Sequence, residues 1–163
     1  MAEIAKPKGR PLEMMVLSDP YYVKYVIRRQ SDTVGELKLK KEFKRLIAQF
    51  DEMKMNAECP NCGRPAKFLA YYKSTFFHEL WCGECSPFWL EHFSGRMDIF
   101  NTYMSALDYV DSFCYGDRSL LKAIIRNLAR LKGLSPKLNA REAKEFFRGA
   151  EEIVQRATCD VRR

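Results

Sequence analysis

Two Cys-x-x-Cys pairs constrain the fold of this chain more than any other feature of its sequence. Cys59 and Cys62 form the first pair, Cys82 and Cys85 form the second, and 19 residues separate Cys62 from Cys82. Each pair presents two thiols from one tight turn, and this separation lies within the spacing of a four-cysteine zinc site. Because zinc prefers four ligands in a tetrahedron, the sequence predicts that these four cysteines bind one Zn²⁺ ion.

The predicted zinc site is structural, because four thiolates fill the coordination sphere and leave no position for water or substrate. A redox Cys-x-x-Cys usually occurs once, before a helix in a βαβ unit, and this chain has two pairs and no such pattern. His78 is an alternative ligand to one of the cysteines, although on a strand we expect it to face solvent or a neighbouring tyrosine. Cys114 and Cys159 are expected to be ordinary half-buried residues.

A cytoplasmic location is the expectation from the sequence. The first residues lack the apolar core of a signal peptide, and no run approaches the roughly 18 apolar residues of a membrane span. In a reducing compartment, paired cysteines are more often metal ligands than disulfides.

Apolar periodicity and turn residues predict five helices and two strands. The predicted helices cover Tyr21 to about Arg29 after Asp19-Pro20, Leu39 to Met53, Met97 to Phe113, Arg118 to Lys132 before Gly133, and the chain after Asn139. The predicted strands, Lys67 to Tyr72 and Thr75 to Trp81, form a hairpin between the two cysteine pairs.

The segment from Cys59 to Cys85 resembles the zinc ribbons of transcription, replication and RNA-processing proteins. The resemblance covers about 27 residues, in which Cys-Pro-x-Cys-Gly is followed by a hairpin and a second Cys-x-x-Cys. Zinc ribbons bind nucleic acid in some proteins and other proteins elsewhere, so the resemblance implies a fold and a metal without implying one function.

The expected fold class is α+β, mostly helical, with a small β-hairpin zinc ribbon inserted between N- and C-terminal helical segments. We expect an N-terminal helical segment over residues 1–56, the ribbon over 57–96 and a three-helix segment over 97–163. A hydrophobic content of 47% supplies enough apolar surface to order such a chain.

The N-terminal segment carries a second motif, Lys8-Gly9-Arg10-Pro11-Leu12, then Val16, then Ser18-Asp19-Pro20-Tyr21-Tyr22-Val23-Lys24-Tyr25-Val26-Ile27. This segment is similar to the exodeoxyribonuclease X-like C-terminal module, a short element appended to nucleases and found in phage and bacterial proteins. Tyr25 stands where that family often has tryptophan, and the usual phenylalanine-glycine before the first lysine is missing. The resemblance does not imply nuclease activity, because that chemistry resides in a separate acidic domain.

The charge pattern favours a phosphate-bearing partner. The net charge is +7, and the excess of basic residues flanks the cysteine region. Candidate nucleic-acid contacts are basic residues on two helices and two hairpin aromatics suited to stacking on bases: Lys40, Lys41, Lys44, Arg45, Arg118, Lys122, Arg126, Arg130, Tyr72 and Phe76. The alternative is that the basic residues form solvated helix faces and the aromatics pack against helices.

An enzyme is disfavoured, because the chain has no Gly-rich phosphate loop, no metal-binding His-Glu pair and no nucleophile elbow. The leading hypothesis is a non-catalytic zinc-ribbon protein that binds nucleic acid as an accessory factor in DNA or RNA transactions. An alternative is a protein-interaction adaptor that docks through the ribbon. A third hypothesis is a metal-dependent nuclease subunit completed by a partner. Asp108 and Asp111, three residues apart on a predicted helix, are candidates for a divalent ion, and the alternative is that they are solvated or paired with a neighbouring base.

Overall fold

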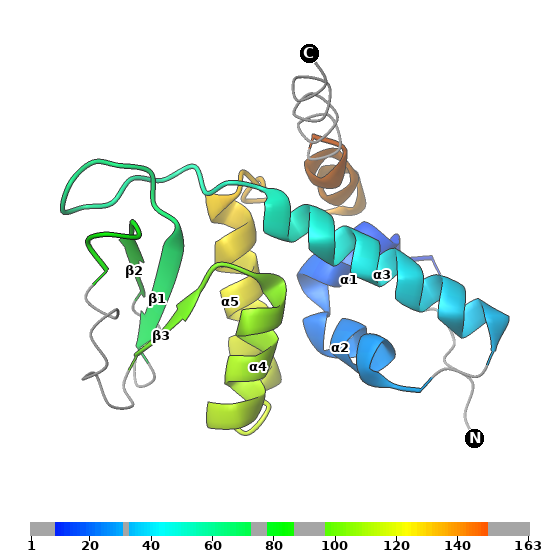
Figure 1. Ribbon diagram of the computed structural model, residues 1–163. Helices are drawn as coiled ribbons and strands as arrows, with labels where there is room; N and C mark the ends of the chain where they lie inside the picture. Colours follow the sequence, from blue (N-terminus) through cyan, green and yellow to red (C-terminus); the bar gives the residue numbers. More distant parts are fainter. Residues whose placement is uncertain (1–8, 31–32, 73–77, 87–96, 150–163) are drawn as a thin grey trace, which may run out of the picture.

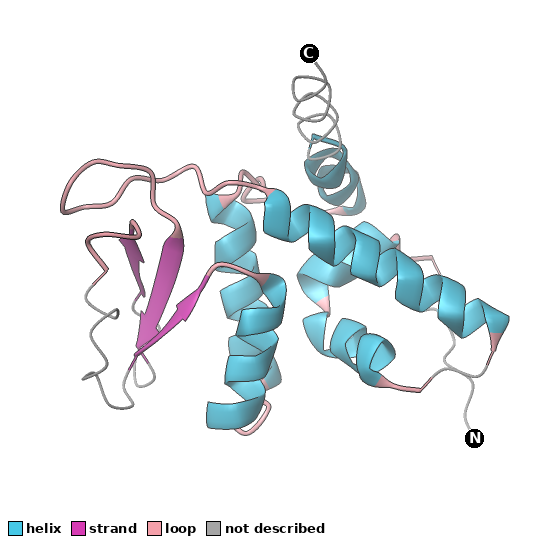
Figure 2. Cartoon of the chain, viewed as in Figure 1, coloured by secondary structure: helices cyan, strands magenta, loops and turns pink. Residues whose placement is uncertain are grey.

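The computed structural model describes residues 9–30, 33–72, 78–86 and 97–149, and it is α+β with helix as the main element (Figures 1 and 2). In chain order the elements are α1 (Leu12–Ser18), α2 (Pro20–Arg28), α3 (Val34–Glu52), β1 (Phe68–Tyr72), β2 (His78–Trp81), β3 (Met97–Phe100), α4 (Tyr103–Phe113) and α5 (Arg118–Leu131). A last helix begins at residue 140 and is described to residue 149.

Several predicted helix boundaries are confirmed. Each of them is fixed by a capping residue that lies within a few positions of the helix end. The Asp19 carboxylate accepts a hydrogen bond from the Tyr22 backbone N–H at 3.2 Å, and Pro20 is the first residue of α2. Gly133 follows α5 with φ +101°, a conformation that glycine adopts without strain. The Asn139 side chain accepts from the Glu142 N–H at 3.0 Å and caps the last helix.

Helix α1 was not predicted. Its seven residues are too few to show a helical period, yet Met15, Val16 and Leu17 are all buried. The helix ends at Asp19 (φ −137°, ψ 61°), since the residue before a proline disfavours the α conformation. Helix α3 also begins earlier than expected, because the Thr33 hydroxyl caps it by accepting from the Glu36 N–H.

The sheet has three strands, which corrects the prediction of a helix from Met97. β1 lies in the centre and pairs antiparallel with β2 on one edge and β3 on the other. Met97–Phe100 therefore supplies backbone partners to β1, and the helix begins only at Tyr103. Thr102 then caps α4 through a capping box with Ser105. The predicted hairpin between β1 and β2 is present, with residues 73–77 outside the described part.

One hydrophobic core joins helices that lie on both sides of the cysteine region in the sequence. Helix α5 packs against α1, α2 and α4, while α3 packs against α1, α2 and α4. The sheet lies beside α4 and α5, on the side away from α1 to α3 (Figure 1), and contributes Leu69 to the core. The principal buried side chains are Val16, Leu17, Val23, Val26, Phe43, Leu46, Phe50, Tyr103, Leu107, Val110, Leu121, Ile124 and Leu128.

The chain leaves α3 towards the first cysteine pair along a path tied to the end of α5. The Asn56 N–H donates to the Leu131 carbonyl at 2.6 Å, and the Lys132 ammonium donates to the Met53 carbonyl at 2.6 Å. Lys132 is buried, and burial lowers its pKa, although the nearby Asp51 carboxylate opposes this. These bonds hold the start of the cysteine segment against the helical core.

Asp111 belongs to an ion-pair network between α2 and α4. In the sequence it falls inside the apolar face of α4, and the structure accounts for this placement because Lys24 and Arg28 both donate to its carboxylate. Asp108 pairs with Arg28 alone. Burial raises the pKa of Asp111, but the hydrogen bonds and charges of the two basic residues outweigh burial and lower it.

We expect Asp111→Asn to lower the free energy of unfolding by about 1–2 kcal/mol at pH 7, because it leaves two cations without their shared carboxylate. A lowered pKa in the folded state stabilises the fold above the unfolded-state pKa of about 4, and that contribution is lost as pH falls through the folded-state pKa. Urea unfolding followed by circular dichroism measures the change. Asp108→Asn is the control, since Asp108 is more exposed, and equal effects of the two variants would contradict the prediction.

Candidate metal centre and basic helix faces

The first cysteine pair lies in a tight turn closed by backbone hydrogen bonds. The Cys59 N–H donates to the Arg64 carbonyl at 2.7 Å, and the Gly63 N–H donates to the Cys59 carbonyl at 2.9 Å. Gly63 has φ +69°, so glycine is required at this point of the turn. Gly83, the corresponding glycine of the second turn, has no positive φ, and a side chain there would meet open space.

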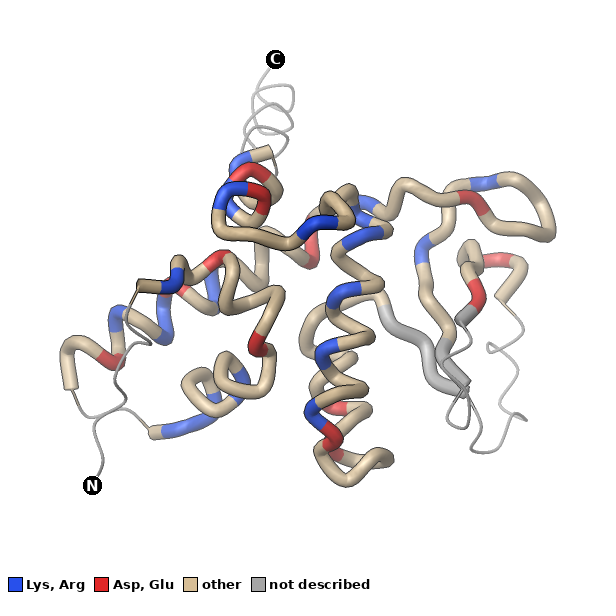
Figure 3. The backbone as a smooth tube through the Cα atoms, turned by 180° about the vertical axis from the view of Figure 1, so that it is seen from behind, with Lys and Arg blue, Asp and Glu red and all other residues tan. Residues whose placement is uncertain are grey.

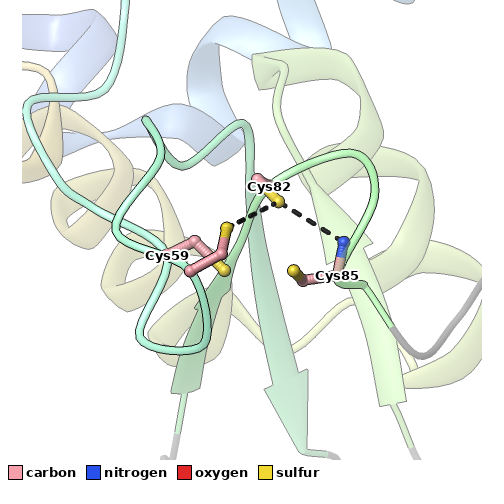
Figure 4. Close-up of side chains that lie close together, drawn as sticks. Cys59, Cys82 and Cys85 are labelled. Carbon is pink, nitrogen blue, oxygen red and sulfur yellow. Dashed lines mark hydrogen bonds between the residues drawn. The ribbon is translucent and has the colours of Figure 1, made fainter.

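The four sulfur atoms of Cys59, Cys62, Cys82 and Cys85 all lie within 4.8 Å of one another. The first two come from the turn before β1 and the last two from the turn after β2, so pairing of the two strands brings the turns together (Figure 4). The Lys67 N–H, which donates to the Trp81 carbonyl at 2.9 Å, fixes this end of the hairpin. Cys59 and Cys82 are buried, while Cys62 is exposed.

Hydrogen bonds to sulfur shape the ionisation of the cluster. The Arg64 Nε–H donates to the Cys62 Sγ at 3.3 Å and lowers the pKa of that thiol to about 6. The Asn61 amide donates to the Cys85 Sγ at 3.3 Å, which by itself lowers its pKa, but the neighbouring Cys62 and Cys82 sulfurs raise it to about 11. Thiols this close cannot all ionise without a cation, so metal binding must displace protons.

Arg64 connects the two cysteine turns and was not singled out in the sequence. Besides donating to Cys62, its guanidinium pairs with the Glu84 carboxylate at 2.6 Å, and Glu84 lies between the two cysteines of the second pair. The pKa of Glu84 is lowered by this hydrogen bond and charge. The sequence shows Arg64 just after the first cysteine pair and Glu84 inside the second. It does not show that they meet, because their contact depends on the pairing of β1 with β2.

The cluster can hold one metal ion. Its four thiols offer four ligand atoms, and soft thiolates favour zinc and other thiophilic metals over hard cations such as Mg²⁺ or Ca²⁺. Four protein ligands would leave no position open, so the arrangement can stabilise a fold but offers no site for a metal-bound water.

The predicted basic stripe on α5 is present, and Figure 3 shows basic positions recurring along the length of this central helix. Its members lie at four-residue steps, about 6 Å apart along the axis. Arg118 and Arg130 are exposed, whereas Lys122 and Arg126 are half-buried. Arg118 stacks on the Tyr21 ring, with 4.0 Å from the guanidinium carbon to the ring centroid. None of the four pairs with a carboxylate within the part of the chain that the structure describes.

The predicted basic cluster on α3 is less available for a binding partner than the stripe on α5, because two of its members already have partners within the chain. Lys40 donates to the Arg29 carbonyl at 3.0 Å, and Arg45 pairs with Glu42 at 3.0 Å. Lys41 and Lys44 are exposed. Helices α1 and α2 pack against both α3 and α5.

Other candidate residues gain no support from the described residues. Tyr72 is the last residue of β1, but its side chain and all of Phe76 lie outside what is described, so the stacking and adaptor hypotheses stay predictions. Asp108 and Asp111 were candidates for a divalent ion, and both pair with basic residues of α2. Cys114 is half-buried, as expected, and Cys159 lies outside the described residues.

Among the described helices, none combines the length and apolar character needed to cross a bilayer. Comparisons of the chain with models of protein families, with curated proteins and with solved structures find no match. The resemblances to zinc ribbons and to the exodeoxyribonuclease X-like module therefore rest on the sequence motifs alone.

Proposed function

We propose that the four cysteines bind one structural Zn²⁺ ion and that the segment around them is a zinc ribbon. Zinc bound to four thiolates at about 2.3 Å places sulfur atoms about 3.8 Å apart in a regular tetrahedron. The distance between the Cys62 and Cys82 sulfurs is 3.6 Å, close to that value. Four metal-binding thiols also favour a reducing compartment, which makes a cytoplasmic location part of this proposal.

The protein binds nucleic acid through α5, as a non-catalytic accessory factor in DNA or RNA transactions. The observation that carries this proposal is the unpaired state of Arg118, Lys122, Arg126 and Arg130 within the described part of the chain. Lys24, Arg28, Arg45 and Arg64 are matched by acids. Lys41 and Lys44 of α3 also lack a described carboxylate partner, but α5 carries four such residues at regular four-residue steps. Phosphate groups would supply the counter-charge that α5 lacks.

A row of phosphate contacts gives affinity that depends steeply on salt, because each contact releases condensed counterions. Removing one phosphate contact lowers the slope of log K against log salt by about 0.7 for a single strand and about 0.9 for a duplex. Phosphate contacts carry no base preference, so this surface predicts binding that is weakly dependent on sequence.

The double variant Arg118→Gln/Lys122→Gln is expected to weaken nucleic-acid binding about tenfold or more near 100 mM salt and to reduce the salt slope by about 1.4 for a single strand and about 1.8 for a duplex. Fluorescence anisotropy with a labelled single strand and with a duplex, each over a salt series, measures both quantities. Glutamine keeps a polar, helix-compatible side chain and removes the charge, although it is shorter than lysine or arginine.

Lys41→Gln/Lys44→Gln is the matched control, because it removes the same charge from exposed positions of α3. If the control variant loses more affinity than the α5 variant, the interface lies on α3 and the assignment to α5 is wrong. Absence of binding by the wild-type, metal-loaded protein at about 50 mM salt would remove the nucleic-acid proposal as a whole.

A further inference from the structure

A small pocket lies where the basic stripe of α5 ends. Arg126 and Arg130 line one side of it, and the segment between α5 and the last helix lines the other with Leu134, Ser135, Pro136 and Leu138. Its volume is about 170 Å³. The polar side chains of the lining are thus two arginines one helical turn apart and one serine, and the lining surface is more polar than apolar.

The two arginines have no counter-charge in this pocket. The residues that line it include no acid, and no described carboxylate pairs with either arginine. The Nε–H of Arg126 is also shielded from solvent and has no hydrogen-bond partner among the described residues. A buried donor of a charged group without an acceptor costs free energy, and an oxyanion in the pocket would supply counter-charge and acceptors to the two guanidinium groups.

The pocket volume limits the ligand. A volume of 170 Å³ leaves room for a few water molecules or one small ion. Pockets for drug-sized molecules span about 300–1,000 Å³, so a nucleoside is too large for this site. A tetrahedral oxyanion fits the size, and its oxygens match two guanidinium groups and a serine hydroxyl.

We propose that the pocket formed by Arg126, Arg130 and Ser135 binds a single phosphate group. Within the proposed nucleic-acid function, on which this part of the inference rests, that group is the terminal phosphate of a strand. A terminal phosphate carries up to two negative charges, which match the two unpaired guanidinium groups better than the single charge of an internal phosphodiester. It is also attached to the strand by one bond, so only one side of a small pocket must stay open to the chain.

The first test uses inorganic phosphate with the full-length, metal-loaded protein. Titration at constant ionic strength, followed by ³¹P NMR line broadening, should show saturable binding that Arg130→Gln weakens about tenfold or more. Arg130 is exposed, so this variant tests the pocket even if Arg126→Gln fails to fold. Lys137→Gln is the matched control, because Lys137 lies in the same segment but does not line the pocket.

The second test compares single strands of one sequence that carry a phosphate or a hydroxyl at the 5′ end, and a third with a 3′ phosphate. A tenfold preference for either phosphorylated end, lost in Arg130→Gln and kept in Lys137→Gln, supports the assignment to a terminal phosphate. Equal binding of all three strands overturns that assignment while the proposed function stands.

The two tests also separate the pocket from the proposed function. Saturable binding of inorganic phosphate without any binding of strands would support the assignment of the pocket as a phosphate site. It would also show that the bound phosphate does not belong to a nucleic acid. If inorganic phosphate does not bind, or binds equally well to Arg130→Gln, the pocket is not a phosphate site.

Discussion

Cys82→Ser is expected to abolish stoichiometric metal binding and to unfold the three-stranded sheet. Cys82 is only 4% exposed, and its sulfur accepts the Cys85 N–H at 3.3 Å, so it occupies the interior of the cluster. In small zinc domains, metal binding contributes about 10–16 kcal/mol of apparent free energy at pH 7. That range is as large as the whole net stability of a typical domain, about 5–15 kcal/mol, so we expect the sheet to unfold when the proposed metal cannot bind.

The helices need not unfold with the sheet, because most of the core lies among them. Among the described sheet residues, Leu69 is buried in that core and Leu80 packs against it. We therefore expect the far-ultraviolet helical signal to be largely kept while amide protons of β1 lose protection from hydrogen exchange. Chelation of the wild-type protein should produce the same state.

Elemental analysis of the purified protein, combined with hydrogen exchange, measures this outcome. Cys114→Ser is the control, because Cys114 lies at the end of α4 and outside the cluster, and this variant should keep one metal per chain. Full metal content and unchanged protection of β1 in Cys82→Ser would contradict the proposed role of the cysteines.

Tyr103→Ala is expected to lower the free energy of unfolding by about 3–5 kcal/mol, as truncations of large buried side chains do. Tyr103 is fully buried, and its ring packs edge-to-face on Phe50 with centroids 5.6 Å apart. Its hydroxyl donates to the Val16 carbonyl at 2.8 Å, and its backbone N–H donates to the Asp51 carboxylate at 2.6 Å. One residue thus connects α4 to α1 and α3.

Tyr103→Phe separates the hydroxyl from the ring. It should cost about 1–2 kcal/mol, because the Val16 carbonyl keeps its burial and loses its donor. Tyr115→Phe is the matched control, since Tyr115 is fully exposed and loss of its hydroxyl should change stability by less than about 0.5 kcal/mol. Urea unfolding at fixed metal content measures all three variants, and indistinguishable midpoints for the two phenylalanine variants would contradict the expected role of the buried hydroxyl.

Features encoded within a few residues were predictable. The cap of α2 at Asp19, the end of α5 at Gly133 and the cap at Asn139 all depend on groups that reach one another across two to four positions of the chain. The hairpin between the cysteine pairs has the same local character, because β1 and β2 are close in the sequence. The short helix α1 escaped prediction because seven residues carry too little periodic signal.

The error at Met97 has a different cause. Apolar residues at Met97 and Phe100 extend the helical period of α4 backwards, so the local pattern favoured helix. Pairing with β1 decides the outcome, since the strand register aligns Leu69 with Phe100 and Tyr72 with Met97. Backbone hydrogen bonds to a strand that lies much earlier in the chain cannot be recognised from the period of one segment.

By itself the sequence determined the four clustered cysteines, the α+β class and most helix boundaries, because ligand spacing, capping and periodicity are local properties of the chain. Only the tertiary structure decided that Asp111 meets Lys24 and Arg28, that Arg64 reaches Glu84, and that the basic residues of α5 have no carboxylate partner in the described part while Lys40 and Arg45 of α3 are engaged. Ion pairs between residues far apart in the sequence form only after packing has placed the helices. The charges that remain for a partner are therefore a property of the folded protein.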